Sequence, residues 1–401
     1  MRFIFAKIEF GEDSHIMIIK STHVYIAGSF LPSAIELCEG TITRILPYHT
    51  EGCDIDFHDL RIVPGFIDIH CHGYNGYDTN DPDPEGLKAW AKQIPSEGVT
   101  SFLATTVTQM KPVLLSAVKN VAAVSRTHQP GADGAAILGI HFEGPYLNLR
   151  HKGAQPPEAI VPPSVTEFQE YQTAAEGLIR LITLAPENDA DFALTRYCAS
   201  HGVRVSIGHT DATYEQAMLA AANGAVSITH TFNAQTPFRH RENGTAGASL
   251  RLHGLYGEII CDCVHTTPEA LHIFYQCKGR DKAIMISDAL MCKGFPAGSR
   301  FMFGGHEVEI WEDGCAHLTD VPEHNLAGST MRTCDGLRNL VEKALVPFDA
   351  ALDSCTVNPA ALLGEDSHIG SIKAGYDADL VVLNDNYSIA ETFCKGVVQL
   401  H

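Results

Sequence analysis

The chain has 401 residues, of which 45% are apolar and 19% are charged, proportions typical of an ordinary soluble globular protein. This length exceeds one small core but fits a barrel of ~250 residues together with a second domain. The formal net charge of −20 argues against nucleic acid or an anionic membrane as a partner, whereas a few local cations can still bind an anionic small molecule.

We find no sign of a targeting or anchoring segment. The run from Met1 to Lys7 is soon followed by Glu9 and Glu12, so we do not expect a secretory leader. No run of ~18 apolar residues predicts a membrane span. The twelve cysteines are scattered and include no Cys-x-x-Cys pair, which favours reduced thiols over disulfides or a structural zinc. We therefore expect a cytoplasmic protein.

The two ends of the chain consist of short apolar segments separated by turns. Residues 1–63 and 369–401 share this pattern, which is typical of short β-strands. Because the section between them has a different pattern, we expect the two ends to pair and to form one small discontinuous domain, a β-sandwich. The segments expected to be strands are 16–19, 23–26, 34–37, 41–45, 380–383 and 396–400.

Residues 64–368 alternate between strand-like apolar segments and helical segments, which predicts an α/β domain. The strand-like segments are 62–69, 100–106, 136–142, 179–184, 204–207, 225–229, 258–260 and 283–286. Helices are expected at 84–97, 111–126, 190–201 and 213–223, among others. Eight strands close a (β/α)8 TIM-like barrel. Residues 301–320 predict a β-hairpin inserted after the eighth strand.

A His-x-His motif, His70 and His72, follows the first strand segment of the predicted barrel. Because side chains alternate across a strand, the two imidazoles point the same way and Cys71 points the other way. Two imidazoles at one place suit zinc, iron or a similar divalent ion. An isolated pair of this kind is more often found on a solvated loop, so the other strand ends decide between the two interpretations.

Histidines and carboxylates follow most of the other predicted strands. They are His141 and Glu143 after the third, His209 after the fifth, His230 after the sixth, His265 beyond the seventh and Asp288 after the eighth. A buried histidine with satisfied hydrogen bonds explains any one of these. A barrel, however, directs all its strand ends to one pocket, so together they predict a metal site.

Metal-assisted hydrolysis is the chemistry that such a site performs. A divalent ion lowers the pKa of a bound water to about 7, and a carboxylate then holds that water and carries its proton to the leaving group. Asp288 suits this role by type and by position. The alternative is that Asp288 caps the N-terminus of a helix, which is a common role for aspartate after a strand.

Seven motifs follow one another in a recognisable order. They are His-x-His at 70–72, His-x-Glu-Gly-Pro-Tyr-Leu-Asn at 141–148, Gly-His-Thr at 208–210, Thr-His-x-Phe-Asn-Ala at 229–234, Asp-x-x-His at 262–265, Ser-Asp-Ala at 287–289 and Leu-Ala-Gly-Ser-Thr at 326–330. This succession resembles the amidohydrolase superfamily and, more narrowly, the N-acetylglucosamine-6-phosphate deacetylases. The resemblance runs from about residue 60 to the segment 370–380, most of the chain.

The resemblance implies roles for individual residues. The principal metal would be bound by Glu143, His209 and His230, and a second metal by His70 and His72. Asp288 would act as general base and then as acid, and His265 would contact the substrate and help to polarise the acetyl carbonyl. Substrate binding is implied for Gln155, Asn233, Ala234, Arg241, His265, Leu326, Ala327 and Gly328. The metal would be zinc, with iron, manganese or cobalt as alternatives, at one or two ions per chain.

The resemblance also implies a homodimer in which Arg241 reaches the phosphate of the substrate in the partner subunit. A bidentate guanidinium suits that task, although an exposed loop arginine is the ordinary interpretation. The expected reaction converts N-acetyl-D-glucosamine 6-phosphate and water into D-glucosamine 6-phosphate and acetate.

Three positions depart from the family pattern, and all of them bear on the sugar and phosphate pocket. Gln155 stands where a histidine is usual, Cys263 where a glycine is usual and Asn243 where a proline is usual. N-acetyl-D-galactosamine 6-phosphate, or another N-acyl amino sugar, is therefore an alternative substrate. A barrel that binds sugar phosphates without catalysis is a further alternative, and the presence of Asp288 beside every metal ligand argues against it.

Overall fold

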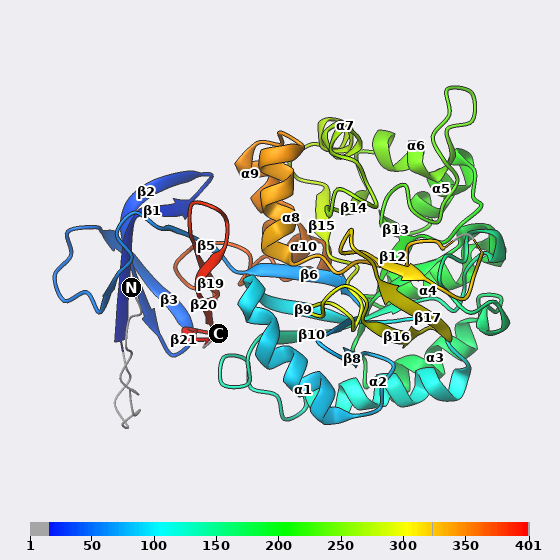
Figure 1. Cartoon of the computed structure of the whole chain (residues 1–401), viewed down its shortest axis with the longest axis horizontal. Helices are drawn as coiled ribbons and strands as arrows, with labels where there is room; N and C mark the ends of the chain where they lie inside the picture. Colours follow the sequence, from blue (N-terminus) through cyan, green and yellow to red (C-terminus); the bar gives the residue numbers. More distant parts are fainter. Residues whose placement is uncertain (1–15, 323, 400–401) are drawn as a thin grey trace.

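The computed structural model describes residues 16–322 and 324–399 and divides them into a small β domain and a larger α/β domain (Figure 1). The strands of the small domain come from both ends of the chain, and the larger domain comes from the section between them. No helix among the described residues is long and apolar enough to cross a membrane.

The larger domain is built on a parallel sheet of eight strands, as the sequence predicts. Its strands, in chain order, are β6 (Phe66–Cys71), β9 (Val99–Thr106), β10 (Ala136–Glu143), β11 (Ile179–Leu184), β12 (Arg204–Ile207), β13 (Ala225–Ile228), β14 (Tyr256–Ile260) and β15 (Ala283–Ile286). Neighbours in the chain are neighbours in the sheet from β6 to β15. A parallel bridge between Cys71 and Ala289 joins the two ends of this sheet, so the sheet is a nearly closed barrel.

Helices surround this barrel and connect its strands (Figure 1). The α-helices are α1 (Pro84–Gln93), α2 (Lys111–Ser125), α3 (Val165–Ala174), α4 (Ala193–Ser200), α5 (Tyr214–Ala222), α6 (Gly244–Arg251), α7 (Pro268–Lys278), α8 (Thr333–Arg338), α9 (Phe348–Asp353) and α10 (Val357–Leu363). Shorter turns are the 3-10 helices η1 (Ile94–Glu97), η2 (Leu149–His151), η3 (Pro157–Ala159), η4 (Pro186–Asn188) and η5 (Ala190–Phe192) and the π-helix η6 (Asn339–Lys343). Local sequence explains several starts: Thr213 and Gln216, for example, form a capping box at α5.

The small domain combines the two ends of the chain, as expected. Its strands are β1 (Ile16–Ile26), β2 (Ser29–Cys38), β3 (Thr41–Pro47), β4 (Ile55–Asp56), β5 (Arg61–Pro64), β19 (Leu380–Leu383), β20 (Ile389–Cys394) and β21 (Val397–Val398). The C-terminal β19 pairs antiparallel with the N-terminal β5, for instance through Val381 and Val63. Hydrogen bonds join all eight strands into one sheet around a core that includes Ile19, Ile35 and Phe393.

The predicted domain limits, 1–63, 64–368 and 369–401, stay predictions. Residues 1–15, which include the segment that we do not expect to be a leader, lie outside the described residues, as do residues 400 and 401.

The expectation of one strand at 62–69 is wrong. The chain leaves the small sheet after β5 and enters the barrel with β6. Gly65 lies at the junction, where an added Cβ would come 2.1 Å from Thr100 Oγ1 on β9. Pro64 and this close approach separate the strands, because proline lacks the N–H that a continuous ladder needs. The break explains how one apolar run serves two domains.

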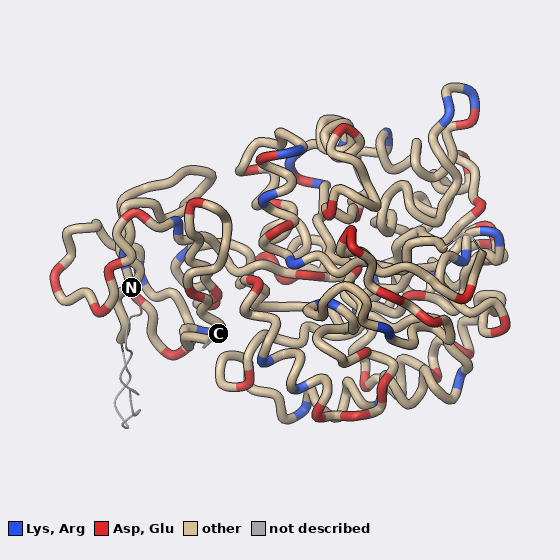
Figure 2. Tube along the Cα trace, viewed as in Figure 1, with Lys and Arg blue, Asp and Glu red and all other residues tan. Residues whose placement is uncertain are grey.

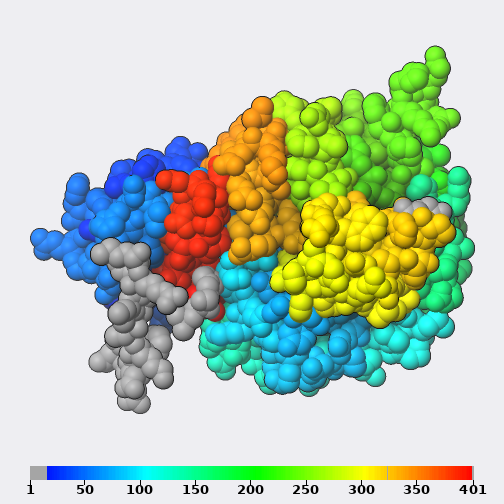
Figure 3. All heavy atoms as spheres, viewed as in Figure 1, coloured from blue at the N-terminus to red at the C-terminus, as the bar shows by residue number. Residues whose placement is uncertain are grey.

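The expected insertion after the eighth strand is a three-stranded antiparallel sheet. It comprises β16 (Arg300–Phe303), β17 (His306–Ile310) and β18 (Ala316–Leu318). In Figure 3 this yellow segment covers part of the face of the larger domain that is turned to the viewer. A smaller pair, β7 (Gly73–Tyr74) and β8 (Tyr77–Asp78), follows the first barrel strand.

Candidate active site

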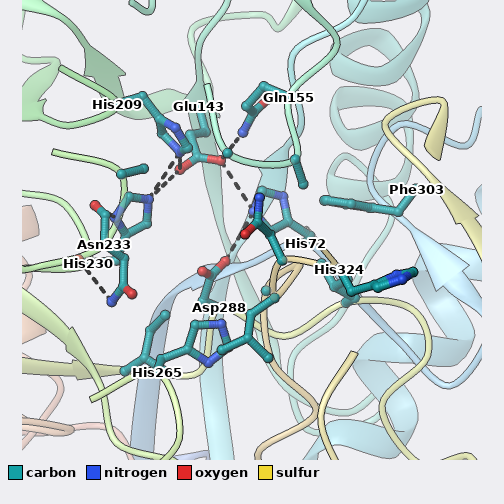
Figure 4. Close-up of a pocket in the computed structure, with 18 residues that line it drawn as sticks. His72, Glu143, Gln155, His209, His230, Asn233, His265, Asp288, Phe303 and His324 are labelled. Carbon is teal, nitrogen blue, oxygen red and sulfur yellow. Dashed lines mark hydrogen bonds and ion pairs between the residues drawn. The ribbon is translucent and has the colours of Figure 1, made fainter. Parts of the chain in front are cut away.

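A cavity of about 510 Å³ opens where the barrel strands end (Figure 4). Eleven of the fourteen predicted site residues line it: His72, Glu143, Gln155, His209, His230, Asn233, Ala234, His265, Asp288, Leu326 and Gly328. His70 lies beneath the cavity, fully buried, and Ala327 is also buried. Arg241 does not line the cavity of its own chain. The strand ends therefore meet at one place, as the barrel prediction requires.

Glu143, the last residue of β10, lies between two histidines. Its Oε1 is 3.2 Å from His209 Nε2 and 3.2 Å from His230 Nε2. His209 follows β12 and His230 follows β13, and all three side chains are nearly inaccessible to solvent. These are the three residues for which the resemblance implies the principal metal.

A second group lies beside the first. His70 and His72, at the end of β6, place their Nε2 atoms 3.4 Å and 3.3 Å from Asp288 Oδ1. The same two nitrogens lie 3.4 Å and 3.3 Å from the carboxylate of Glu143. Glu143 thus contacts both groups and connects them (Figure 4).

Asp288 does not cap a helix. The next element after it is the strand β16, and its backbone N–H donates to the carbonyl oxygen of His70 at 2.9 Å. Asp288, His209 and His230 have positive φ angles of 50°, 47° and 28°. Such backbone conformations cost about 1–3 kcal/mol each in residues other than glycine and cluster at functional sites.

Backbone carbonyl groups orient the histidines of the first group. His209 Nδ1 lies 2.8 Å from the carbonyl oxygen of His151, and His230 Nδ1 lies 3.1 Å from that of Asn233. Because a carbonyl oxygen only accepts hydrogen bonds, both Nδ1 atoms donate. Both Nε2 atoms are thereby turned toward Glu143, and each would offer its lone pair to a metal ion that displaces the Nε2 proton, which is the arrangement that metal-binding histidines use.

Charge dominates the pKa values of this cluster. Burial alone would raise the pKa of Asp288, but the attraction of His70 and a hydrogen bond with His72 outweigh it and lower this pKa to about 2. Burial likewise disfavours a charged His72, yet Asp288 and Glu143 raise the pKa of His72 to about 10. The carboxylates thus attract positive charge, which a metal ion supplies when it displaces protons from its ligands.

Both groups fit a divalent cation. Within each group the ligand atoms lie within 4.8 Å of one another, and all six residues are buried. The Nε2 atom of His70 is buried and has no hydrogen-bond partner among the described residues. Imidazole and carboxylate donors suit zinc, iron, manganese or cobalt.

His265 faces the cavity from beyond β14 and is held by Asp262. Its Nδ1 lies 2.6 Å from Asp262 Oδ2, and its backbone N–H also donates to this carboxylate. Between them Cys263 has a φ of 65°, a conformation that glycine adopts without strain. This turn explains why glycine is usual at a position where the present chain carries cysteine.

Glu258 and Phe303 lie near the site and were not predicted from the sequence, whereas His141 was noted at the end of the third strand without a role of its own. Glu258 Oε2 lies 3.0 Å from His70 Nδ1, and neither side chain is accessible to solvent. His141 packs edge to face on His70, at 4.4 Å between ring centroids. Burial and then the nearby His70 lower the pKa of His141 well below its usual value. Phe303 of the inserted sheet also lines the cavity. One sign of Glu258 was present in the sequence, namely that its carboxylate interrupts the otherwise uncharged segment 256–260.

Arg241 lies on an exposed loop, residues 237–243, that connects β13 to α6. This loop projects from the larger domain at the upper right of Figure 1, and Figure 2 shows that it carries both basic and acidic residues. Asn243, the third departure from the family pattern, is at its end and precedes the first residue of α6.

The model of the amidohydrolase family matches residues 61–398. The N-acetylglucosamine-6-phosphate deacetylase of Bacillus subtilis (strain 168) is 38% identical over 338 residues, 84% of either chain. The N-acetylgalactosamine-6-phosphate deacetylase of Escherichia coli O157:H7 is 32% identical and covers 90% of this chain and 93% of its own.

Solved structures agree with this relationship. A mutant N-acetyl-D-glucosamine-6-phosphate deacetylase from Mycobacterium smegmatis, in complex with N-acetyl-D-glucosamine-6-phosphate, superposes with a TM-score of 0.89 at 28% identity. It covers 96% of this chain and 100% of its own. The N-acetylglucosamine-6-phosphate deacetylase of Pasteurella multocida gives the same values. The chain therefore belongs to the amidohydrolase family.

Proposed function

We propose that this enzyme hydrolyses N-acetyl-D-glucosamine 6-phosphate to D-glucosamine 6-phosphate and acetate. The observation that carries the proposal is the presence of two neighbouring ligand groups, one of which contains Asp288. Glu143 connects the two groups at the floor of a cavity of about 510 Å³. The names of relatives at 38% and 32% identity, and of the structure bound to this sugar phosphate, support the substrate class.

In this proposal Asp288 moves the proton. Its carboxylate is an anion, since its pKa is lowered to about 2 by the surrounding histidines in spite of its burial. It accepts a proton from the attacking water and then delivers it to the amide nitrogen, so that the amine does not leave as an anion. Lewis-acid activation of the water and of the amide carbonyl is the chemistry that a divalent ion bound by Glu143, His209 and His230 supplies.

His265 and the walls of the cavity orient the acetamido sugar. Asp262 fixes the imidazole of His265 through Nδ1, which leaves Nε2 for the acetyl group. Asn233, Ala234, Leu326 and Gly328 line the cavity, and we assign sugar and phosphate contacts to them. Ala327 is buried, so its role is to support this wall.

Zinc is the proposed metal, and iron, manganese and cobalt are compatible with the same donors. One ion would occupy the group of Glu143, His209 and His230. A second would occupy the group of His70, His72 and Asp288, with Glu143 between the two.

A homodimer would complete the phosphate site. Among residues 16–322 and 324–399, no lysine or arginine lines the cavity, although a phosphate group requires positive charge. We propose that Arg241 on the projecting loop supplies this charge to the cavity of a partner subunit, through paired N–H donors.

All twelve cysteines are free thiols, which supports a cytoplasmic location.

N-acetyl-D-galactosamine 6-phosphate is the second candidate substrate. Two observations favour it: Gln155 and Cys263 depart from the family pattern close to the cavity, and one of the relatives is an N-acetylgalactosamine-6-phosphate deacetylase. A panel of N-acetyl hexosamines with and without a 6-phosphate, assayed by acetate release, tests the choice. We expect the highest kcat/KM for N-acetyl-D-glucosamine 6-phosphate. A higher value for the galacto epimer would favour the second candidate, and bound metal without hydrolysis of any panel member would support a non-catalytic barrel.

A further inference from the structure

The loop after β10 contacts side chains of the metal-ligand cluster at three places. Residues 148–155 run along the wall of the cavity, through the short helix η2, and Gly153, Ala154 and Gln155 line it. The carbonyl oxygen of His151 accepts the Nδ1–H of His209 at 2.8 Å. At Gly153 an added Cβ would lie 3.3 Å from His209 Cε1, so the loop backbone packs directly on this ring.

Gln155 makes the third contact, through both ends of its amide. Nε2 donates to Glu143 Oε2 at 2.8 Å, and Oε1 accepts the backbone N–H of Thr108 at 2.7 Å (Figure 4). Because the N–H of Thr108 requires an acceptor, the orientation of the amide is determined and Nε2 must face Glu143. Only 3% of Gln155 is exposed.

This contact orients the carboxylate that both ligand groups share. Gln155 and His72 lie on the side of Glu143 Oε2, while Oε1 faces His209 and His230. Without the donated hydrogen bond, His72 alone would remain on the side of Oε2, and the carboxylate would be held less firmly in the orientation that directs Oε1 toward both rings. Hydrogen bonds of this kind orient metal ligands and raise metal affinity.

We propose that Gln155 is a positioning residue for Glu143, and that it holds this carboxylate toward the metal. The family histidine implied for this position contacts the sugar. Here both the carbonyl and the amino end of the Gln155 side chain are engaged within the protein. The inference rests on the proposed metal site, and its test needs neither substrate nor turnover.

The test measures zinc affinity of the apoenzyme by competition with a chromophoric chelator. Gln155→Met keeps the length of the side chain and removes both hydrogen bonds, and we expect it to bind zinc about 10–100-fold more weakly. Gln155→Asn keeps an amide that is one methylene too short to join Thr108 and Glu143, and we expect a loss in the same range. If the Met variant does not fold, the Asn variant carries the test.

Asn80 offers a matched control. Its amide also binds this region, by donating to the carbonyl oxygen of Val107 at 2.8 Å and accepting its N–H at 3.1 Å, but it does not contact Glu143. We expect Asn80→Ala to leave zinc affinity unchanged. Wild-type zinc affinity in both Gln155 variants would overturn the proposal, because Gln155 would then not position Glu143 for the metal. Failure of the wild-type protein to bind zinc or another divalent ion would instead contradict the proposed function.

Discussion

His70 and Glu258 form a buried pair beneath the cavity, with 3.0 Å between Nδ1 and Oε2 and no solvent exposure of either side chain. The carboxylate fixes the ring of His70 and leaves its Nε2 toward Glu143 and Asp288, at 3.4 Å from each. Carboxylates that orient a metal-binding histidine in this way are common in metal sites. The second ligand group therefore depends on a residue that does not itself reach the cavity.

Removal of Glu258 should weaken the second metal position selectively. Glu258→Leu leaves His70 without its orienting partner, so we expect the affinity for one of two metal ions to fall about 10–100-fold. Glu258→Gln retains a carbonyl oxygen that accepts the Nδ1–H, so its loss should be smaller. Metal content per chain, measured during titration of the apoenzyme, distinguishes the variants. Two ions bound with unchanged affinity in the Leu variant would show that this pair does not orient His70.

Loss of Arg241 should affect phosphorylated substrates alone. If its guanidinium binds the phosphate in the partner subunit, Arg241→Ala removes charge-assisted hydrogen bonds worth about 1.5–3 kcal/mol, which corresponds to a rise in KM of roughly 10–100-fold. The KM for unphosphorylated N-acetyl sugars should not change. Arg239→Ala is the control on the same loop, since Arg239 pairs with Glu242 at 3.4 Å. Equal effects of the two variants would contradict a specific role for Arg241.

Asp379 should make the stability of the protein depend on pH. Burial raises the pKa of Asp379 from 3.8 to about 7, although the backbone N–H of Lys395 donates to its carboxylate at 2.7 Å. The folded protein therefore binds a proton that the unfolded chain releases near pH 4. The resulting stabilisation is complete below pH 4 and is lost as the pH rises to 7, by up to about 4 kcal/mol.

Asp379→Asn keeps the oxygen acceptor and removes the titration. We expect urea unfolding at pH 8 to show a variant that is more stable than the wild type by about 4 kcal/mol, and unfolding at pH 5, where part of the stabilisation is already lost, to show a smaller difference of about 2 kcal/mol. The difference in the free energy of unfolding between the two proteins separates the effect of Asp379 from that of other groups that titrate in this range. Glu391 is one of these groups, because burial raises its pKa to about 7. A difference that does not change with pH would contradict the assignment.

Local pattern was sufficient to predict the barrel and most of its site. Apolar runs of strand length mark the barrel strands, and the polar residues that follow them converge because all parallel strands end at the same face. This reasoning correctly brought Glu143, His209, His230 and Asp288 together. It also identified the pairing of the two chain ends, since both carry the same pattern of short strands.

Contacts between distant segments were beyond this reasoning. Glu258 is 188 residues from His70 in the chain, and no local pattern indicates that they pair. The break between β5 and β6 depends on Thr100 of a neighbouring strand, which approaches Gly65 too closely for a side chain. The engagement of Gln155 with Glu143 depends on the path of the loop 148–155, and loops follow tertiary contacts more than they follow local sequence.

The turnover of Asp288→Asn tests the central claim most directly. Asparagine retains the shape and one oxygen of Asp288 but cannot accept and return a proton at neutral pH. With N-acetyl-D-glucosamine 6-phosphate as substrate, we expect kcat to fall by about 10²–10⁴, with metal still bound by Glu143, His209 and His230. Circular dichroism and metal analysis of the same preparation verify the fold and the metal content. Turnover close to that of the wild type in a folded, metal-loaded variant would contradict the account.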